Sequence, residues 1–90
     1  METDRETALQ FPCEFPIKVM GRSGIGLRDR VIEIVDRHSA QQLRSRAVSS
    51  RTSRRGNYVS VTAVVWAISQ QQLDDIYREL TACDAVMIAL

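Results

Sequence analysis

The chain is poor in the residues from which catalytic and metal sites are usually built. Its 90 residues include one histidine, two cysteines, two prolines and four glycines. Cys13 and Cys83 form no CxxC pair, so the sequence favours neither a zinc site nor a redox motif. A serine or cysteine nucleophile needs a base that is held by a third group, and His38 at a helix end does not supply one. We therefore expect no catalytic residue, cofactor or metal, and a protein that is not an enzyme.

Long apolar runs and a signal-like N-terminus are also missing. No apolar stretch reaches the roughly 20 residues of a membrane span. The first ten residues, METDRETALQ, lack the basic start and apolar segment of a secretory signal. These features predict a cytoplasmic protein without membrane contact. Because residues 1–10 have no sustained hydrophobic period, we expect a flexible leader there and a single domain over residues 11–90.

Charge is nearly balanced overall, with a net charge of +1, but it is unevenly distributed. The window of residues 44–55 contains five arginines and no acidic residue, and the remaining seven bases and eleven acids sum to −4. These arginines are Arg44, Arg46, Arg51, Arg54 and Arg55. A strand that contains several arginines favours a sheet edge, where charge discourages pairing with another molecule.

The longest regular pattern is residues 56–68, GNYVSVTAVVWAI, which predicts a mostly buried central strand. Shorter strands are predicted at residues 15–20, 43–52 and 85–90. Apolar residues at helical spacing predict one helix from Leu27 to His38 and a second after Ser69, where Ser69 and Gln72 match a capping box. The resulting order is β-α-β-β-α-β.

This order predicts an α+β fold, the ferredoxin-like two-layer sandwich with two helices on one face of the sheet. We expect an antiparallel sheet with spatial order 4-1-3-2. Within it, we expect the two central strands, the first and third, to run parallel. Cys13 lies before the first strand and Cys83 lies where the fourth strand begins. We expect them to be too far apart for a disulfide, so both thiols should be free.

Two stretches resemble the YbeD-like family of small bacterial proteins: FPCEFPIKVMG at residues 11–21 and SSRTSRRGNYVSVTA at residues 49–63. The resemblance continues through DRHS and QLDDIYREL, and it covers nearly all of the chain after the leader. It rests on Lys18, Val19, Met20, Gly21, Ser53, Gly56, Tyr58 and Ser60. The resemblance implies a fold similar to ACT-type regulatory domains, a regulatory or ligand-sensing role, and an association with lipoate metabolism.

A glycine-rich turn, GRSGIG at residues 21–26, lies between the first strand and the first helix. Helix N-termini bind anions through free backbone N–H groups, and Arg22 adds positive charge. The sequence therefore predicts a small anionic ligand at Arg22, Ser23, Gly24 and Gly26. The alternative is structural, because glycines relieve strain in tight turns. ACT domains that bind amino acids commonly have an acidic residue and a proline-glycine here, and this chain has neither.

The arginine-rich hairpin, residues 44–55, is a second candidate site. Arg51, Arg54 and Arg55 are placed to contact phosphates, as in nucleic-acid binders. Tyr58 is the single aromatic residue nearby, and a set of base-stacking residues is missing. A solvated, aggregation-resistant edge is therefore the favoured interpretation, and RNA binding is the alternative.

An apolar patch on the uncovered face of the sheet is the third candidate. With parallel central strands, Met20, Val64, Trp66 and Met87 are expected to gather at one end of that face. Exposed apolar patches often mark association surfaces, and residues 85–90 add an uncharged edge strand. The alternative is a set of half-exposed side chains covered by the leader. We thus expect a regulatory or interaction domain that binds a partner protein, a second copy of itself or a small anionic ligand.

Overall fold

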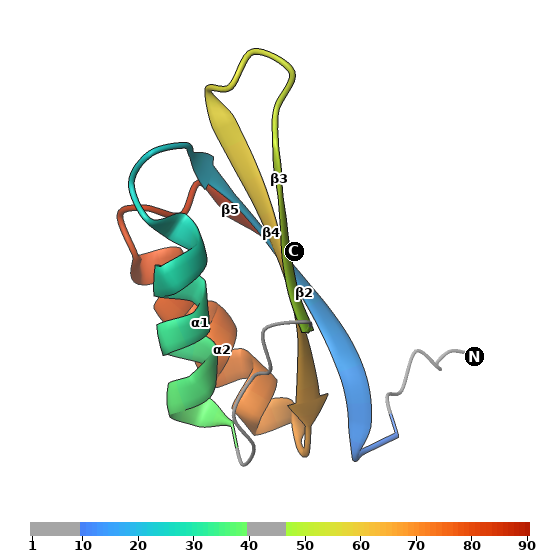
Figure 1. Cartoon of the computed structure of the whole chain (residues 1–90). Coiled ribbons are helices and arrows are strands. Elements are labelled where there is room, and N and C mark those ends of the chain that lie inside the picture. Colours follow the sequence, from blue (N-terminus) through green and yellow to red (C-terminus); the bar gives the residue numbers. More distant parts are fainter. Residues whose placement is uncertain (1–9, 40–46) are drawn as a thin grey trace, which may run out of the picture.

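The computed structural model describes residues 10–39 and 47–90, and within them it has the predicted element order (Figure 1). The strands are β2 (Cys13–Arg22), β3 (Val48–Thr52), β4 (Tyr58–Ala67) and β5 (Ile88–Ala89), and the helices are α1 (Leu27–His38) and α2 (Gln70–Ala82). The predicted leader lies outside the described residues except for Gln10. The first part of the predicted second strand, residues 43–46, also lies outside them.

The strands form one sheet in the order β3-β4-β2-β5, which is the predicted 4-1-3-2 arrangement. Each pairing between neighbouring strands is antiparallel. Both helices cover the same face of the sheet, and within residues 10–39 and 47–90 no helix lies on the opposite face (Figure 1). The fold is therefore the predicted ferredoxin-like α+β sandwich.

The predicted parallel direction of the two central strands is wrong. β2 pairs antiparallel with β4 along its whole length, from Cys13 opposite Ala67 to Arg22 opposite Tyr58. The physical reason is the connection: a helical crossover makes β3 run in the same direction as β2, and the tight hairpin then reverses the chain into β4. The start of β4 consequently lies beside the end of β2.

The core lies between the sheet and the helices. On β2 and β4, alternate residues from Ile17 to Val19 and from Val61 to Ala67 are buried, as the period of two in the sequence predicts. The helices contribute their apolar stripes. The largest fully buried side chains are Ile17, Leu27, Leu73, Ile76, Leu80, Val19, Val31, Val35, Val61 and Val65.

Local signals in the sequence explain where the helices begin. Gly26 precedes α1 in the left-handed conformation, with φ 72°, which glycine adopts without strain. Ser69 caps α2, because its hydroxyl accepts a hydrogen bond from the backbone N–H of Gln72 at 3.1 Å. The Gln72 side chain in turn accepts from the backbone N–H of Ile68, at 2.7 Å, one residue before the cap. Together these contacts resemble the predicted capping box.

Gly21 allows the segment after α2 to approach β2 closely. A Cβ atom at this position would lie 2.3 Å from the backbone oxygen of Ala85. The C-terminal segment then pairs with the end of β2, where the backbone N–H of Met87 donates to the carbonyl of Met20 at 2.8 Å. The final segment therefore lies against the first strand, as predicted.

Candidate binding face of the sheet

The uncovered face of the sheet is a grid of side chains whose rows follow the strand register. Residues that lie opposite each other on neighbouring strands point to the same face, so each row crosses the sheet. We use the term hairpin end for the three rows nearest the β3–β4 hairpin. The first row is Arg22 and Tyr58, the second is Arg51, Ser60, Met20 and Ile88, and the third is Ser49, Thr62, Lys18 and Leu90.

A half-open hollow of about 700 Å³ lies over the hairpin end. A second hollow of about 410 Å³ adjoins it, shares Met20, Arg51 and Ser60 with it, and reaches Arg54 of the hairpin. The first falls within the range of about 300–1,000 Å³ that is typical of small-molecule sites. Its lining combines three kinds of side chain: cations (Lys18, Arg51), hydroxyls (Ser49, Ser50, Ser60, Thr62) and apolar groups (Val19, Met20, Ile88, Leu90).

The glycine turn and the arginine hairpin, which the sequence predicts as separate sites, are joined at this end of the sheet. The backbone N–H of Ser23 donates to the carbonyl of Asn57 at 3.0 Å, and the Ser23 hydroxyl donates to the carbonyl of Gly56. Both donors of Ser23 are therefore used to hold the hairpin. Gly24 has φ 82° and, like Gly26, open space around it, so its role here is conformational.

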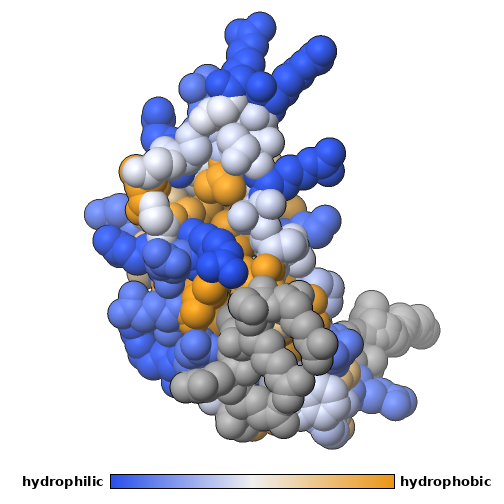
Figure 2. All heavy atoms as spheres, viewed as in Figure 1, coloured by the Kyte–Doolittle hydropathy of each residue, from blue (hydrophilic) through white to orange (hydrophobic). Residues whose placement is uncertain are grey.

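The cations of the hairpin end have no ionic partner among the residues that the structure describes. Lys18, Arg22, Arg51 and Arg54 are all exposed, and each ion pair found among those residues lies on the helices instead. Hydrophilic side chains protrude around the β3–β4 hairpin at the top of Figure 2. Because no described acidic side chain pairs with these charges, they favour an anionic ligand.

The structure does not bring the predicted apolar patch together. Met20 lies opposite Ser60, whereas Trp66 lies six residues further along β4, opposite Glu14, which is about 20 Å away at the usual strand rise. Val64 lies opposite Pro16. The patch was expected at one end only because the central strands were expected to run parallel. The antiparallel register separates Met20 from Trp66.

Met87 is also displaced from the predicted patch. The residue opposite Met20 on β5 is Ile88, and Ile88 rather than Met87 lines the hollow. Met87 precedes the strand and is exposed. Near Trp66, the uncovered face carries Glu14, Pro16 and Val64. We call Trp66, Glu14, Pro16 and Val64 the tryptophan end.

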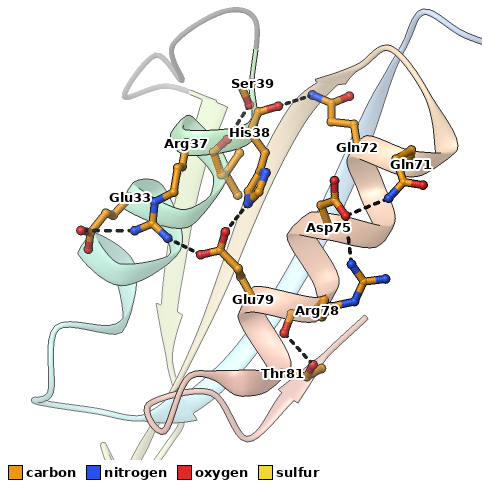
Figure 3. Close-up of polar contacts among 11 residues, drawn as sticks. Glu33, Arg37, His38, Ser39, Gln71, Gln72, Asp75, Arg78, Glu79 and Thr81 are labelled. Carbon is orange, nitrogen blue, oxygen red and sulfur yellow. Dashed lines mark hydrogen bonds and ion pairs between the residues drawn. The ribbon is translucent and has the colours of Figure 1, made fainter.

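The two helices are joined by a polar contact on the other side of the molecule (Figure 3). Glu79 of α2 accepts hydrogen bonds from Arg37 and pairs with the His38 ring, both on α1. Arg37 also pairs with Glu33, one helical turn earlier on α1, at 3.5 Å. The Gln72 side chain donates to the backbone carbonyl of His38 at 3.0 Å. His38 thus joins the two helices.

The sequence analysis did not predict several of the lining residues as part of a site. The alternation of β2 and β4 already assigned Lys18, Ser60 and Thr62 to the face opposite the core. The missing step was the register, because an antiparallel pairing aligns exactly these residues with Met20 at one end of the sheet. Ile88 and Leu90 could be aligned with them only after β5 was placed against β2.

Two negative findings apply to residues 10–39 and 47–90. No helix there is long and apolar enough to cross a membrane. No group of three or more histidine, cysteine or acidic side chains is arranged to hold a metal ion in that part of the chain. Both cysteines are free and partly buried.

The chain is similar to families and proteins that have no assigned activity. A family model described as "Protein of unknown function (DUF493)" matches residues 6–90. A UPF0250 protein of Paraburkholderia phytofirmans is 39% identical over 90 residues, with 100% of each chain covered. A UPF0250 protein of Ectopseudomonas mendocina is 42% identical over 83 residues, which are 91% of this chain and 89% of the relative.

A solved structure has the same fold. The solution structure of protein HP0495 from H. pylori matches with a TM-score of 0.73 and 15% sequence identity, and it covers 100% of this chain and 94% of that one. At this identity the similarity supports the fold alone.

Proposed function

We propose that this protein is a non-catalytic regulatory or interaction module. The chain belongs to the DUF493 (UPF0250, YbeD-like) family of small bacterial proteins of unknown function. It acts by binding a partner protein or a small ligand on the uncovered face of its sheet. A cytoplasmic location belongs to the same proposal.

The observation that supports the proposal is the hollow over the hairpin end. It combines exposed cations with hydroxyl groups and apolar side chains at one place on the sheet. Binding sites commonly have this composition, with an apolar floor and a few polar groups that fix the orientation of the ligand. Lys18 and Arg51 form no ion pair with another described residue, and their charges favour an occupant that is anionic.

Site-specific photocrosslinking in living bacteria tests this proposal. A photoreactive amino acid replaces Ser49, which is exposed in the lining of the hollow, and in a matched variant it replaces Gln71, which is exposed on α2. We expect a defined crosslinked species from position 49 and none from position 71. Equal crosslinking from both positions, or none from position 49, would contradict the use of this face.

A further inference from the structure

The two layers of the described residues differ in net charge: the sheet with its hairpin carries five cations and one acid, and the helical layer carries seven acids and four arginines. Of the acidic residues within residues 10–39 and 47–90, only Glu14 belongs to the sheet, and the other seven lie on α1, on α2 or just after α2. The sheet and its hairpin carry five cations, which are Lys18, Arg22, Arg51, Arg54 and Arg55. The net charge of the whole chain is only +1, and the acid-free arginine window at residues 44–55 is the part of this difference that the sequence shows.

From this difference in charge we infer that the hairpin end binds single-stranded nucleic acid through its phosphates. The inference rests on the use of this face for binding that is proposed above, and it names nucleic acid as the ligand in place of a partner protein or a small ligand. The lining of both hollows contains cations and no aspartate or glutamate side chain. Four of the cations have no ion pair with another described residue, so phosphate contacts would not require an internal salt bridge to break. Their binding energy would come largely from the release of counterions.

The arrangement of the cations matches an extended chain rather than a single small anion. Lys18 and Arg22 lie on the same face of β2 with Met20 between them, so they span about 13 Å at the usual strand rise. Arg51 lies one strand beyond β4 in the Met20 row, and Arg54 continues the line into the hairpin. A basic groove that follows a backbone is the usual arrangement in proteins that bind single strands.

The floor of the groove provides contacts for unpaired bases. Tyr58 is 40% exposed and lies opposite Arg22, and Met20 is 44% exposed and lies between Lys18 and Arg22 on β2. Ile88 is 49% exposed and lies beside Met20 on the edge strand β5. An aromatic ring offers a stacking surface that any base can use. A duplex would leave this floor without a partner, because its base faces are hidden in the stack. Hydroxyls of Ser60 and Thr62 add hydrogen-bonding groups at the same level.

The test is fluorescence anisotropy of a labelled ten-nucleotide oligouridylate with the full chain at several salt concentrations. We expect binding that weakens with salt, with a slope of log K against log salt of about −2 to −3, as three to four phosphate contacts on a single strand predict. Arg51→Glu with Arg54→Glu should weaken binding at least tenfold. Arg30→Glu with Arg78→Glu changes the net charge equally on the helical layer, and it should weaken binding less than threefold.

A second variant separates stacking from charge. Tyr58→Ala should weaken binding about fivefold, at the lower end for one base on an aromatic ring, and should leave the salt slope unchanged. Circular dichroism checks that each variant keeps the fold. Equal affinity for a decaglutamate peptide or for a duplex of the same length would overturn the inference, as would the absence of binding at low salt. If position 49 still crosslinks in cells, the proposed function survives that failure.

Discussion

The two ends of the uncovered face differ in chemistry although they belong to the same two central strands. The hairpin end combines Lys18, Arg22 and Arg51 with hydroxyls and lies under two adjoining hollows. The tryptophan end carries Trp66 and Glu14 and contributes to neither hollow. The exposed fraction is similar at both ends, at 44% for Met20 and 40% for Trp66. Exposed apolar area therefore does not identify the site. The site is identified by the side chains that the strand register places next to each other.

The strongest way to break the hairpin end is to fill the space at Gly21. In Gly21→Ala, the new Cβ would overlap the backbone oxygen of Ala85, which cannot rotate away, and would press on Leu27. We expect a loss of about 3 kcal/mol in the free energy of unfolding, as for severe overpacking. Gly24→Ala is the matched control, with open space but φ 82°, and should cost about 1 kcal/mol. Urea denaturation measures both, and equal losses would contradict the close approach.

The tryptophan end is expected to contribute to stability and not to binding. Trp66→Ala removes a side chain that is still more than half buried, so it should lower the free energy of unfolding by about 1–2 kcal/mol, less than a full core truncation. Affinity for the oligouridylate should stay unchanged. Trp66→Phe, which keeps most of the apolar contact, should lie near the wild type in both measurements. A loss of affinity in Trp66→Ala would show that the two ends act together.

The helical layer provides a third comparison, because several of its charges form ion pairs. Glu79→Ala removes the contacts of one carboxylate with Arg37 and His38. We expect a loss of about 1 kcal/mol, since the groups are only partly buried. Thermal unfolding measures the loss, and Glu33→Ala, which removes only the pair with Arg37 at the surface, should cost less. Neither variant should change oligouridylate binding, and weaker binding in either would contradict the separation of the layers.

The smallest effect is expected at high pH from Tyr77 of α2. Partial burial raises the pKa of Tyr77 above its usual value near 10, because the ionised phenolate is poorly solvated there. The neutral form is therefore favoured in the folded state, and this contribution to stability is present below about pH 10 and is lost as the pH rises through the folded pKa. In Tyr77→Phe, stability should fall less between about pH 9 and pH 11.5 than in the wild type. An equal fall would contradict the assignment.

Most of the fold could be predicted from the sequence because the signals are local. The period of two in residues 58–67, the helical spacing from Leu27 to Val35 and the cap at Ser69 each act within a few residues. They determine the elements and which side of each strand is buried. The family resemblance was also correct, and the similarity of the relatives extends over the full chain.

The site could be predicted only in part because it depends on contacts between distant residues. Arg22 and Arg51 were recognised as basic, but not as neighbours on one face. Their proximity follows from the direction of β4, which places Tyr58 opposite Arg22 and Ser60 between Met20 and Arg51. The wrong direction of this one strand was sufficient to predict Trp66 at the hairpin end, beside Met20. It also led to the prediction that the glycine turn and the hairpin are separate sites.

The most direct test of the account is a map of backbone amide chemical shifts during titration of the labelled protein with oligouridylate. The account predicts changes that centre on Lys18, Arg22, Arg51 and Tyr58, with Glu14, Val64 and Trp66 unchanged. Changes that centre on Trp66, or that spread over α1 and α2, would contradict the central claim that the hairpin end is the binding surface.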